Sequence, residues 1–246
     1  MLKKVMMTML VAATVASGSV VMADAGDIGV TAAVDSKYIW RGFDVFDDHG
    51  IYSANLNVDL GSGFAFDLWS GAPIGSGNED ARENNYIVSY AGTCGAGETG
   101  QVDYGVNFIY YDFYKVNSDS DGLEVGITLD LPNVFQLVGS PVGLSYALGH
   151  VWSDDGNFGS GQYQNVALGS TIGTVDVSVD LGHWRGFVGN DGGAIDGGAS
   201  HIGCTLGTAL EVAGHELSPY ISYQHSMEDN VNTDSDEVSG GISLSF

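Results

Sequence analysis

The sequence predicts an all-β fold, a twelve-stranded antiparallel transmembrane β-barrel of the outer-membrane type. Apolar and polar residues alternate in segment after segment of roughly ten residues, which is the pattern of extended strands with one apolar face. The connections between these segments alternate between long and short, as in barrels that cross an outer membrane. The chain ends in Phe246, and a C-terminal phenylalanine is typical of such barrels.

The first residues predict a secretory signal peptide at 1–23. Two lysines precede an apolar stretch at 5–16, and small residues follow as far as Ala25. We expect cleavage after position 23, with position 25 as the alternative. A membrane-spanning helix would need about 20 apolar residues, whereas serine, threonine and glycine interrupt this stretch. We therefore expect an exported chain with a single barrel domain over 24–246.

Twelve expected strands follow one another along the mature chain. The clearest alternation places Leu123, Val125 and Ile127 on one face and Glu124 and Gly126 on the other. The expected strands cover 28–37, 52–60, 64–69, 86–90, 102–111, 123–131, 142–149, 165–172, 175–184, 202–212, 217–224 and 238–246.

A soluble β-sandwich would alternate in the same way. The outward faces expected here carry essentially no charge, whereas the inward faces carry several carboxylates. In hydrocarbon every backbone amide and carbonyl must pair within the protein, so only a closed sheet can cross. The connection at 132–141 is the one short-side connection that is too long for the pattern. Aromatic residues gather near strand ends, where they would form interfacial girdles: Tyr38, Trp40, Tyr52, Phe64, Tyr110, Trp152 and Phe246.

The net charge of the chain limits which classes of partner it can bind. The net charge is -24 at pH 7, which argues against a nucleic-acid partner and favours cations. Inside the barrel the alternation collects eight carboxylates and two basic residues, namely Asp35, Asp59, Asp67, Asp103, Glu124, Asp130, Asp176 and Asp180 with Lys37 and Arg41. Rings of carboxylates favour cations in a pore. We therefore expect a narrow diffusion channel in which Lys37 and Arg41 face some of these carboxylates across the constriction.

The alternative is that the interior charges pair and plug a non-conducting barrel. Twelve strands lie between the filled eight-stranded barrels and the open porins of 16 strands. Four aromatic residues also face inward by the same count, namely Trp69, Tyr111, Trp184 and Tyr220. They either stack a ligand or fill space.

The long connections are strongly acidic. Residues 117–122 resemble the start of a calcium loop, with Asn117, Asp119 and Asp121 as oxygen ligands before a glycine. The twelfth position of that loop is Thr128, where a glutamate would be needed. Solvated acidic loops are the simpler interpretation, and calcium binding is the alternative. The expected outer loops contain Asp44, Asp47, Asp48, Glu79, Asp80, Glu83, Asp119, Asp121, Asp154, Asp155, Asp191, Asp196, Glu228, Asp229, Asp234 and Asp236.

An enzyme is the competing class of function, because some twelve-stranded barrels are phospholipases with a serine and a histidine two positions apart on one strand. No histidine of this chain has a serine two positions away. A serine and a histidine from different strands could still form a catalytic dyad, but we expect that the protein is not an enzyme. Cys94 and Cys204 would form one disulfide or none.

One family pattern runs through the first third of the chain and more loosely beyond it. The sequence Ser36-Lys37-Tyr38-Ile39-Trp40-Arg41-Gly42, followed by residues 61–64, 68–70, 85–92 and 103–111, resembles the TorF-like porin family of proteobacteria. The resemblance implies an outer-membrane channel. We therefore expect a cell outer-membrane protein that contacts lipid, passes small cationic or neutral polar solutes, and meets the barrel-assembly machinery through Phe246. A receptor or structural barrel is the alternative.

Overall fold

The computed structural model describes residues 27–46, 48–75, 81–95, 100–114, 121–153, 160–188, 194–195, 198–227 and 236–246. The predicted signal peptide lies outside these residues, as do most of the acidic loop residues. Within the described ranges, no helix is long and apolar enough to cross a membrane.

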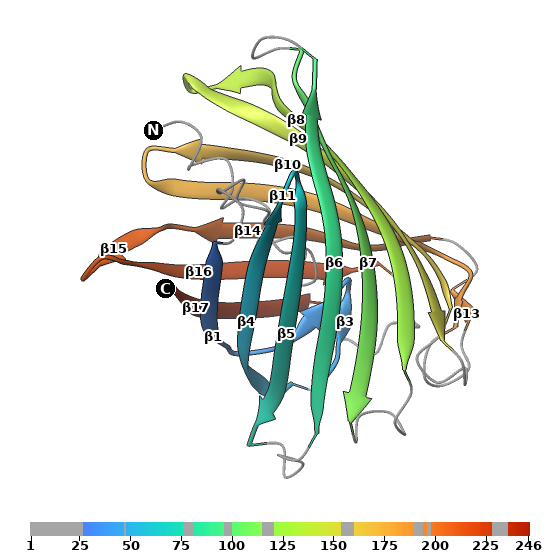
Figure 1. Ribbon diagram of the computed structural model, residues 1–246. Helices are drawn as coiled ribbons and strands as arrows, with labels where there is room; N and C mark the ends of the chain where they lie inside the picture. Colours follow the sequence, from blue (N-terminus) through green and yellow to red (C-terminus); the bar gives the residue numbers. More distant parts are fainter. Residues whose placement is uncertain are drawn as a thin grey trace.

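The described chain forms a closed twelve-stranded antiparallel barrel, so the predicted fold class is confirmed (Figure 1). Each wall strand pairs with the next along the chain, and β1 pairs with β17 to close the sheet, from Thr31 opposite Ser245 to Asp35 opposite Gly241. β14 and β15 both pair with β16 and count as one strand of the twelve. The wall consists of β1 (Ile28–Asp35), β4 (Gly50–Gly61), β5 (Phe64–Ile74), β6 (Arg82–Cys94), β7 (Val102–Tyr114), β8 (Gly122–Leu137), β9 (Ser140–Ser153), β10 (Gly161–Ile172), β11 (Val175–Arg185), β14 (Gly198–Gly207), β15 (Leu210–Val212), β16 (His215–Ser226) and β17 (Asp236–Ser245).

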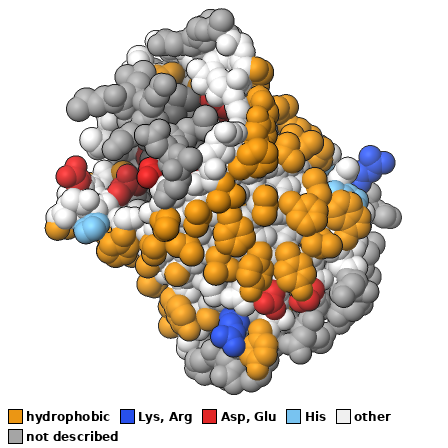
Figure 2. All heavy atoms as spheres, in the orientation of Figure 1, with side chains coloured by type: hydrophobic (Ala, Val, Ile, Leu, Met, Phe, Trp, Pro, Cys, Tyr) orange, Lys and Arg blue, Asp and Glu red, His pale blue; other side chains and the backbone are white. Residues whose placement is uncertain are grey.

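The outer surface of the wall is apolar, as the alternation predicts. Large hydrophobic side chains such as Val106, Ile127 and Val179 are exposed, while their neighbours along each strand are less exposed. Figure 2 shows apolar side chains covering the visible wall, with charged side chains toward its margins. Because successive side chains of a strand point to opposite faces, this apolar surface implies a polar interior.

The connection between β1 and β4 folds into the barrel. We call residues 36–49 the inserted segment; residue 47 is not among its described residues. It contains a small hairpin of β2 (Ile39–Trp40) and β3 (Phe43–Asp44), with Trp40 opposite Phe43. The two turn residues, Arg41 and Gly42, have φ values of 51° and 97°. Positive φ at both central positions is the type I′ geometry of two-residue hairpins.

The inserted segment corrects two predictions. Tyr38 and Trp40 were expected in the interfacial girdles, but their side chains are buried, with 2% and 6% exposure. The first strand was expected to reach residue 37, but it ends at Asp35. In both cases the sequence pattern of a continuing strand was misleading, because the chain leaves the wall after Asp35 and the segment that follows packs inside the barrel.

The connection between β8 and β9 corrects a third prediction. The sequence suggests a long connection at 132–141, but β8 and β9 extend to Leu137 and Ser140, which leaves two turn residues. Those residues, Val138 and Gly139, have φ values of 53° and 81°. The pairing shifts between Leu131 and Phe135, so Pro132, which has no amide hydrogen to donate, lies at an irregularity of the sheet.

A second irregularity lies between β11 and β14. Their register shifts between Gly182 and His183, where β14 carries the extra residue Ser200. An extra residue of this kind breaks the alternation locally. Both Ser200 and His201 are consequently buried, although neighbouring strand residues normally point to opposite faces.

Candidate functional site

An aromatic cluster fills the interior where the inserted segment meets the wall. Trp40 packs against Tyr111 and Trp184, with ring centroids 6.0 Å and 5.6 Å away. Tyr38 stacks on Trp69 at 5.6 Å. Trp69, Tyr111 and Trp184 point inward as predicted, but they contact the chain's own inserted segment. The aromatic residues therefore narrow the interior at this level.

A buried ion pair fixes the tip of the inserted hairpin. Arg41 Nη2 donates to Glu124 Oε1 over 2.6 Å, and Tyr111 donates its hydroxyl to Glu124 Oε2 over 2.7 Å. The Arg41 guanidinium lies 4.8 Å from the Tyr163 ring centroid. Burial alone would lower the pKa of Arg41, but Glu124 and Tyr111 outweigh it and raise that pKa above its ordinary value. Arg41 therefore stays charged inside the barrel.

Gly149 makes room for this pair. A Cβ at position 149 would lie 2.3 Å from Glu124 Oε1 and 3.4 Å from Arg41 Nη1. Any side chain there would displace the carboxylate. The glycine thus allows β9 to pass directly behind the ion pair.

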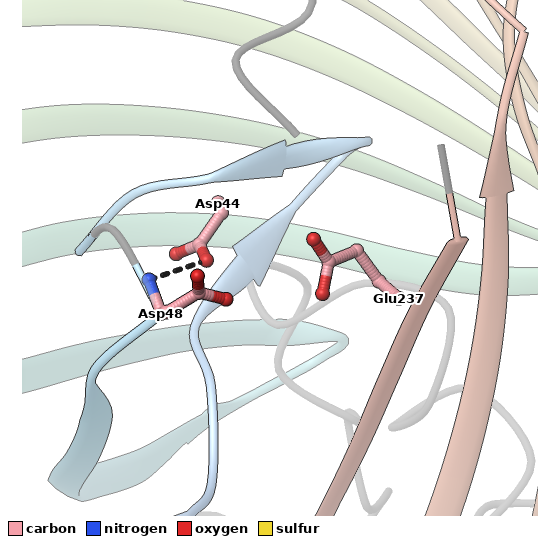
Figure 3. Close-up of side chains that lie close together, drawn as sticks. All are labelled: Asp44, Asp48 and Glu237. Carbon is pink, nitrogen blue, oxygen red and sulfur yellow. Dashed lines mark hydrogen bonds between the residues drawn. The ribbon is translucent and has the colours of Figure 1, made fainter. Parts of the chain in front are cut away.

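A second basic residue holds the base of the inserted segment. Lys37 Nζ donates to Asp48 and to Glu237 of β17. Asp44, Asp48 and Glu237 face one another with carboxylate oxygens within 4.8 Å, and the Asp48 amide donates to Asp44 Oδ2 over 2.7 Å (Figure 3). Burial lowers the pKa of Lys37, but Asp48 and Glu237 outweigh it and raise the pKa above the usual lysine value. The charged ammonium therefore serves as the cation of this acidic cluster.

The remaining interior carboxylates are held mainly by neutral donors. Asn57 donates to Asp67 over 2.8 Å, and Tyr220 donates to Asp35 over 2.8 Å. Ser145 donates to Asp130. Further neutral donors reach Asp59, Asp103 and Asp176 from the Gly61 amide, Thr93 and Thr171. These contacts hold the carboxylates in place without neutralising their charge.

The bulge in β14 assembles a serine, a histidine and an aspartate. Ser200 Oγ lies 2.9 Å from His201 Nδ1, and His201 Nε2 lies 3.0 Å from Asp180 Oδ2. Asn165 donates to the same Asp180 oxygen over 2.9 Å. A Cβ on Gly42 would lie 3.0 Å from His201 Nδ1, so the inserted hairpin packs directly on this array. Ser200 is fully buried.

The structure thus gathers the predicted interior residues into two groups. Arg41, Trp69, Tyr111, Glu124 and Trp184 come together around the inserted segment. The others lie on the interior face of the wall, apart from Lys37, which belongs to the inserted segment: Asp35, Asp59, Asp67, Asp103, Asp130, Asp176, Asp180 and Tyr220. Arg41 opposes Glu124, one of the expected carboxylates, whereas Lys37 pairs with Asp48 and Glu237, which were not among them. Both basic residues reach their partners from the inserted segment and not from a wall strand.

Several contacting residues were missed or misplaced by the sequence analysis. Glu83 was expected in an outer loop, but it lies in β6 with 2% exposure and accepts the Tyr38 hydroxyl over 3.2 Å. Asp44 and Asp48 belong to the inserted segment, where Asp44 is half-buried and Asp48 is exposed. Ser200 and His201 went unnoticed because strand alternation places adjacent residues on opposite faces. The alternation of β6 extends back to Glu83, and this pattern could have placed Glu83 on the strand and facing inward.

Three further sequence predictions concern calcium binding, the disulfide and Phe246. Asn117 and Asp119 of the calcium prediction lie outside the described residues, and Asp121 accepts a hydrogen bond from Tyr110. Calcium binding therefore stays a prediction, which calorimetric titration would test. Cys94 and Cys204 are both free, so the disulfide alternative is not formed. The role of Phe246 in barrel assembly stays a prediction; the residue is exposed.

The fold is that of outer-membrane porin-like barrels. The KdgM porin superposes with a TM-score of 0.56 and 7% sequence identity, covering 89% of this chain and 98% of that one. The same values hold for the KdgM porin in complex with disordered oligogalacturonate. An outer membrane channel from Pseudomonas putida F1 superposes with a TM-score of 0.52 and 11% identity over 92% of this chain and 96% of that one. No protein-family model matches the sequence, and no curated protein matches it. The likeness supports a porin-type barrel, and TorF-like membership stays a prediction.

Proposed function

We propose that this protein is an outer-membrane porin-like channel for small solutes, with a preference for cationic and neutral polar ones. The class rests on the barrel fold shared with porins and channels. On this assignment the long connections face the outside and the two-residue turns face the periplasm.

The observation that carries the cation preference is the unequal pairing of interior charges. Among the described residues, Lys37 and Arg41 are the lysine and arginine side chains that meet interior carboxylates, and His201 contacts Asp180. Most other interior carboxylates meet neutral donors, as in Asp35, Asp67 and Asp130. A low-dielectric wall lined with unneutralised carboxylates attracts cations and repels anions.

The test is the reversal potential of the purified protein in a planar bilayer under a potassium chloride gradient. We expect small conductance steps, because the inserted segment narrows the path, and a reversal potential of the sign that potassium permeation gives. A preference for chloride would contradict the proposal. The folded state of the same preparation is checked by its resistance to heat and detergent in gel electrophoresis.

A non-conducting barrel with a structural or receptor role is the second candidate. The aromatic cluster around Trp40 and the buried pair of Arg41 with Glu124 favour it, because together they occupy the interior at one level. A folded protein that gives no conductance steps at any protein concentration would establish this candidate and remove the first.

A further inference from the structure

The Arg41 guanidinium sits in a receptor built by four consecutive wall strands. We call Tyr111, Glu124, Gly149 and Tyr163 the guanidinium cradle; they come from β7, β8, β9 and β10. Tyr163 lies opposite Gly149 in the register, and Glu124 lies one strand further along. Each member thus stands on a paired, rigid strand of the wall, while Arg41 reaches it from the inserted segment.

Each cradle residue serves a separate part of a flat cation. Glu124 accepts from Arg41 Nη2 over 2.6 Å, and the Tyr111 hydroxyl holds the second carboxylate oxygen at 2.7 Å. The Tyr163 ring centroid lies 4.8 Å from the guanidinium carbon. Gly149 leaves the space beside Glu124 Oε1 and Arg41 Nη1 free of any side chain. A carboxylate that accepts a hydrogen bond, a ring face and a glycine gap suit a planar, delocalised cation.

Leaving the cradle without a cation costs much free energy. Glu124 is 1% exposed, and a buried carboxylate without a cationic partner is strongly unfavourable. Arg41 itself is incompletely satisfied there, since its Nη1 has no hydrogen-bond partner among the described residues. A free cation in the same place would be able to choose its own orientation, which the hairpin backbone prevents Arg41 from doing.

We propose that Tyr111, Glu124, Gly149 and Tyr163 form a binding site for organic cations of the guanidinium class, and that Arg41 occupies this site as an internal ligand. The inference rests on the proposed cation-preferring interior only in that such solutes must enter the lumen. Potassium and sodium are strongly hydrated and gain little from a ring face, so the cradle discriminates against them. In the unmodified protein Arg41 excludes guanidinium solutes from the site, and they gain it only where Arg41 is removed or the inserted segment is displaced.

The test removes the internal ligand and supplies a free one. Arg41→Ala is purified in detergent, and its thermal unfolding is followed with methylguanidinium chloride at increasing millimolar concentrations against potassium chloride at equal ionic strength. We expect a midpoint below that of the unmodified protein, and a rise of about 3–6 °C with methylguanidinium at roughly ten times its Kd, which continues logarithmically at higher concentrations. Potassium chloride should produce no such rise.

Three controls define the site. The unmodified protein should show no rise, because Arg41 fills the cradle. The double variant Arg41→Ala with Glu124→Gln should show none, because the acceptor charge is lost. Arg82→Ala removes an exposed arginine that lies over Tyr114 at the end of β6, so it should respond as the unmodified protein does.

Two outcomes overturn the inference: no methylguanidinium-specific rise in Arg41→Ala, or an equal rise in the double variant. If Arg41→Ala fails to refold, methylguanidinium must restore its refolding yield, and failure to do so also overturns it. The reversal potential of the unmodified protein is independent of this assay. If the channel is cation-selective but methylguanidinium does not stabilise Arg41→Ala, only the proposed guanidinium site is wrong. If methylguanidinium stabilises Arg41→Ala but the channel has no cation preference, only the proposed ion selectivity is wrong.

Discussion

Glu124 shows how one residue gains its role from its neighbours. On its strand it is a polar position between apolar ones, and sequence alternation suffices to point it inward. Its partners come from elsewhere: Arg41 lies 83 positions away, and Tyr111 belongs to the preceding strand. A buried carboxylate is tolerable only because both contacts are present.

Replacing Glu124 by Gln should therefore be costly. The change leaves Arg41 buried without an opposite charge, and the expected loss of unfolding free energy is about 3–5 kcal/mol. Urea unfolding in detergent, followed by tryptophan fluorescence, measures it. Glu216→Gln, at an exposed position of β16, is the matched control and should stay within about 0.5 kcal/mol of the unmodified protein. Equal stability of the two variants would refute the buried pair as a stabilising contact.

Ser200 is the residue at which the expected lack of hydrolytic activity can be tested. Its contacts with His201 and Asp180 have the distances of a nucleophile, a base and an orienting acid. The serine is fully buried beneath Gly42, however, so a substrate has no access. We expect no labelling of the folded protein by a fluorophosphonate probe, read by mass spectrometry. Labelling that Ser200→Ala abolishes would show a reactive serine and reopen the enzyme class.

At the scale of elements, the inserted segment is the part that departs from a plain barrel. Four kinds of contact hold it: the aromatic cluster, the Arg41 pair, the Lys37 pairs and the packing of Gly42 on His201. Burying several aromatic rings contributes about 1.5–3 kcal/mol each. These contacts stabilise the segment in its position inside the barrel.

Removing the segment should widen the path. Asp35 pairs with Ile51, so residues 36 and 50 would be the next pair of the two strands. Replacing residues 37–49 by Asn-Gly would close them with a type I′ turn. We expect a several-fold larger single-channel conductance from the variant. A control with Asn-Gly in place of Val138-Gly139, at the opposite end of the barrel, should conduct as the unmodified protein does. Equal conductance in all three proteins would show that the segment does not limit the path.

At the scale of the whole molecule, charge is segregated by surface. The outer surface is apolar over the strands, while the interior holds carboxylates at many levels of the barrel. Asp103 and Asp130 lie opposite each other on β7 and β8, without a basic partner at either one among the described contacts. Such pairs make the interior field negative well away from the inserted segment.

Neutralising that pair should weaken the cation preference. In Asp103→Asn with Asp130→Asn the ratio of potassium to chloride permeability should fall toward one, since the interior loses two negative charges. Reversal potentials under a salt gradient measure the ratio. Asp236→Asn changes an exposed carboxylate at the beginning of β17 and serves as the control, with a smaller effect expected. An unchanged ratio in the double variant would place the selectivity elsewhere.

The sequence by itself determined the architecture, because the strands of a barrel wall follow from the local alternation of apolar and polar residues. Each strand exposes an apolar face and hides a polar one, and this pattern can be read residue by residue in β8 or β11. The same pattern correctly pointed Trp69, Tyr111 and Glu124 inward.

Only the tertiary structure decided what lies inside the barrel. Tyr38 and Trp40 are buried in the aromatic cluster, because the inserted segment leaves the wall and packs inside the barrel, although their spacing suited an interfacial girdle. One extra residue in β14 turns Ser200 and His201 to the same side. Both features depend on contacts between distant strands, and local periodicity carries no information about which distant surface a segment will meet.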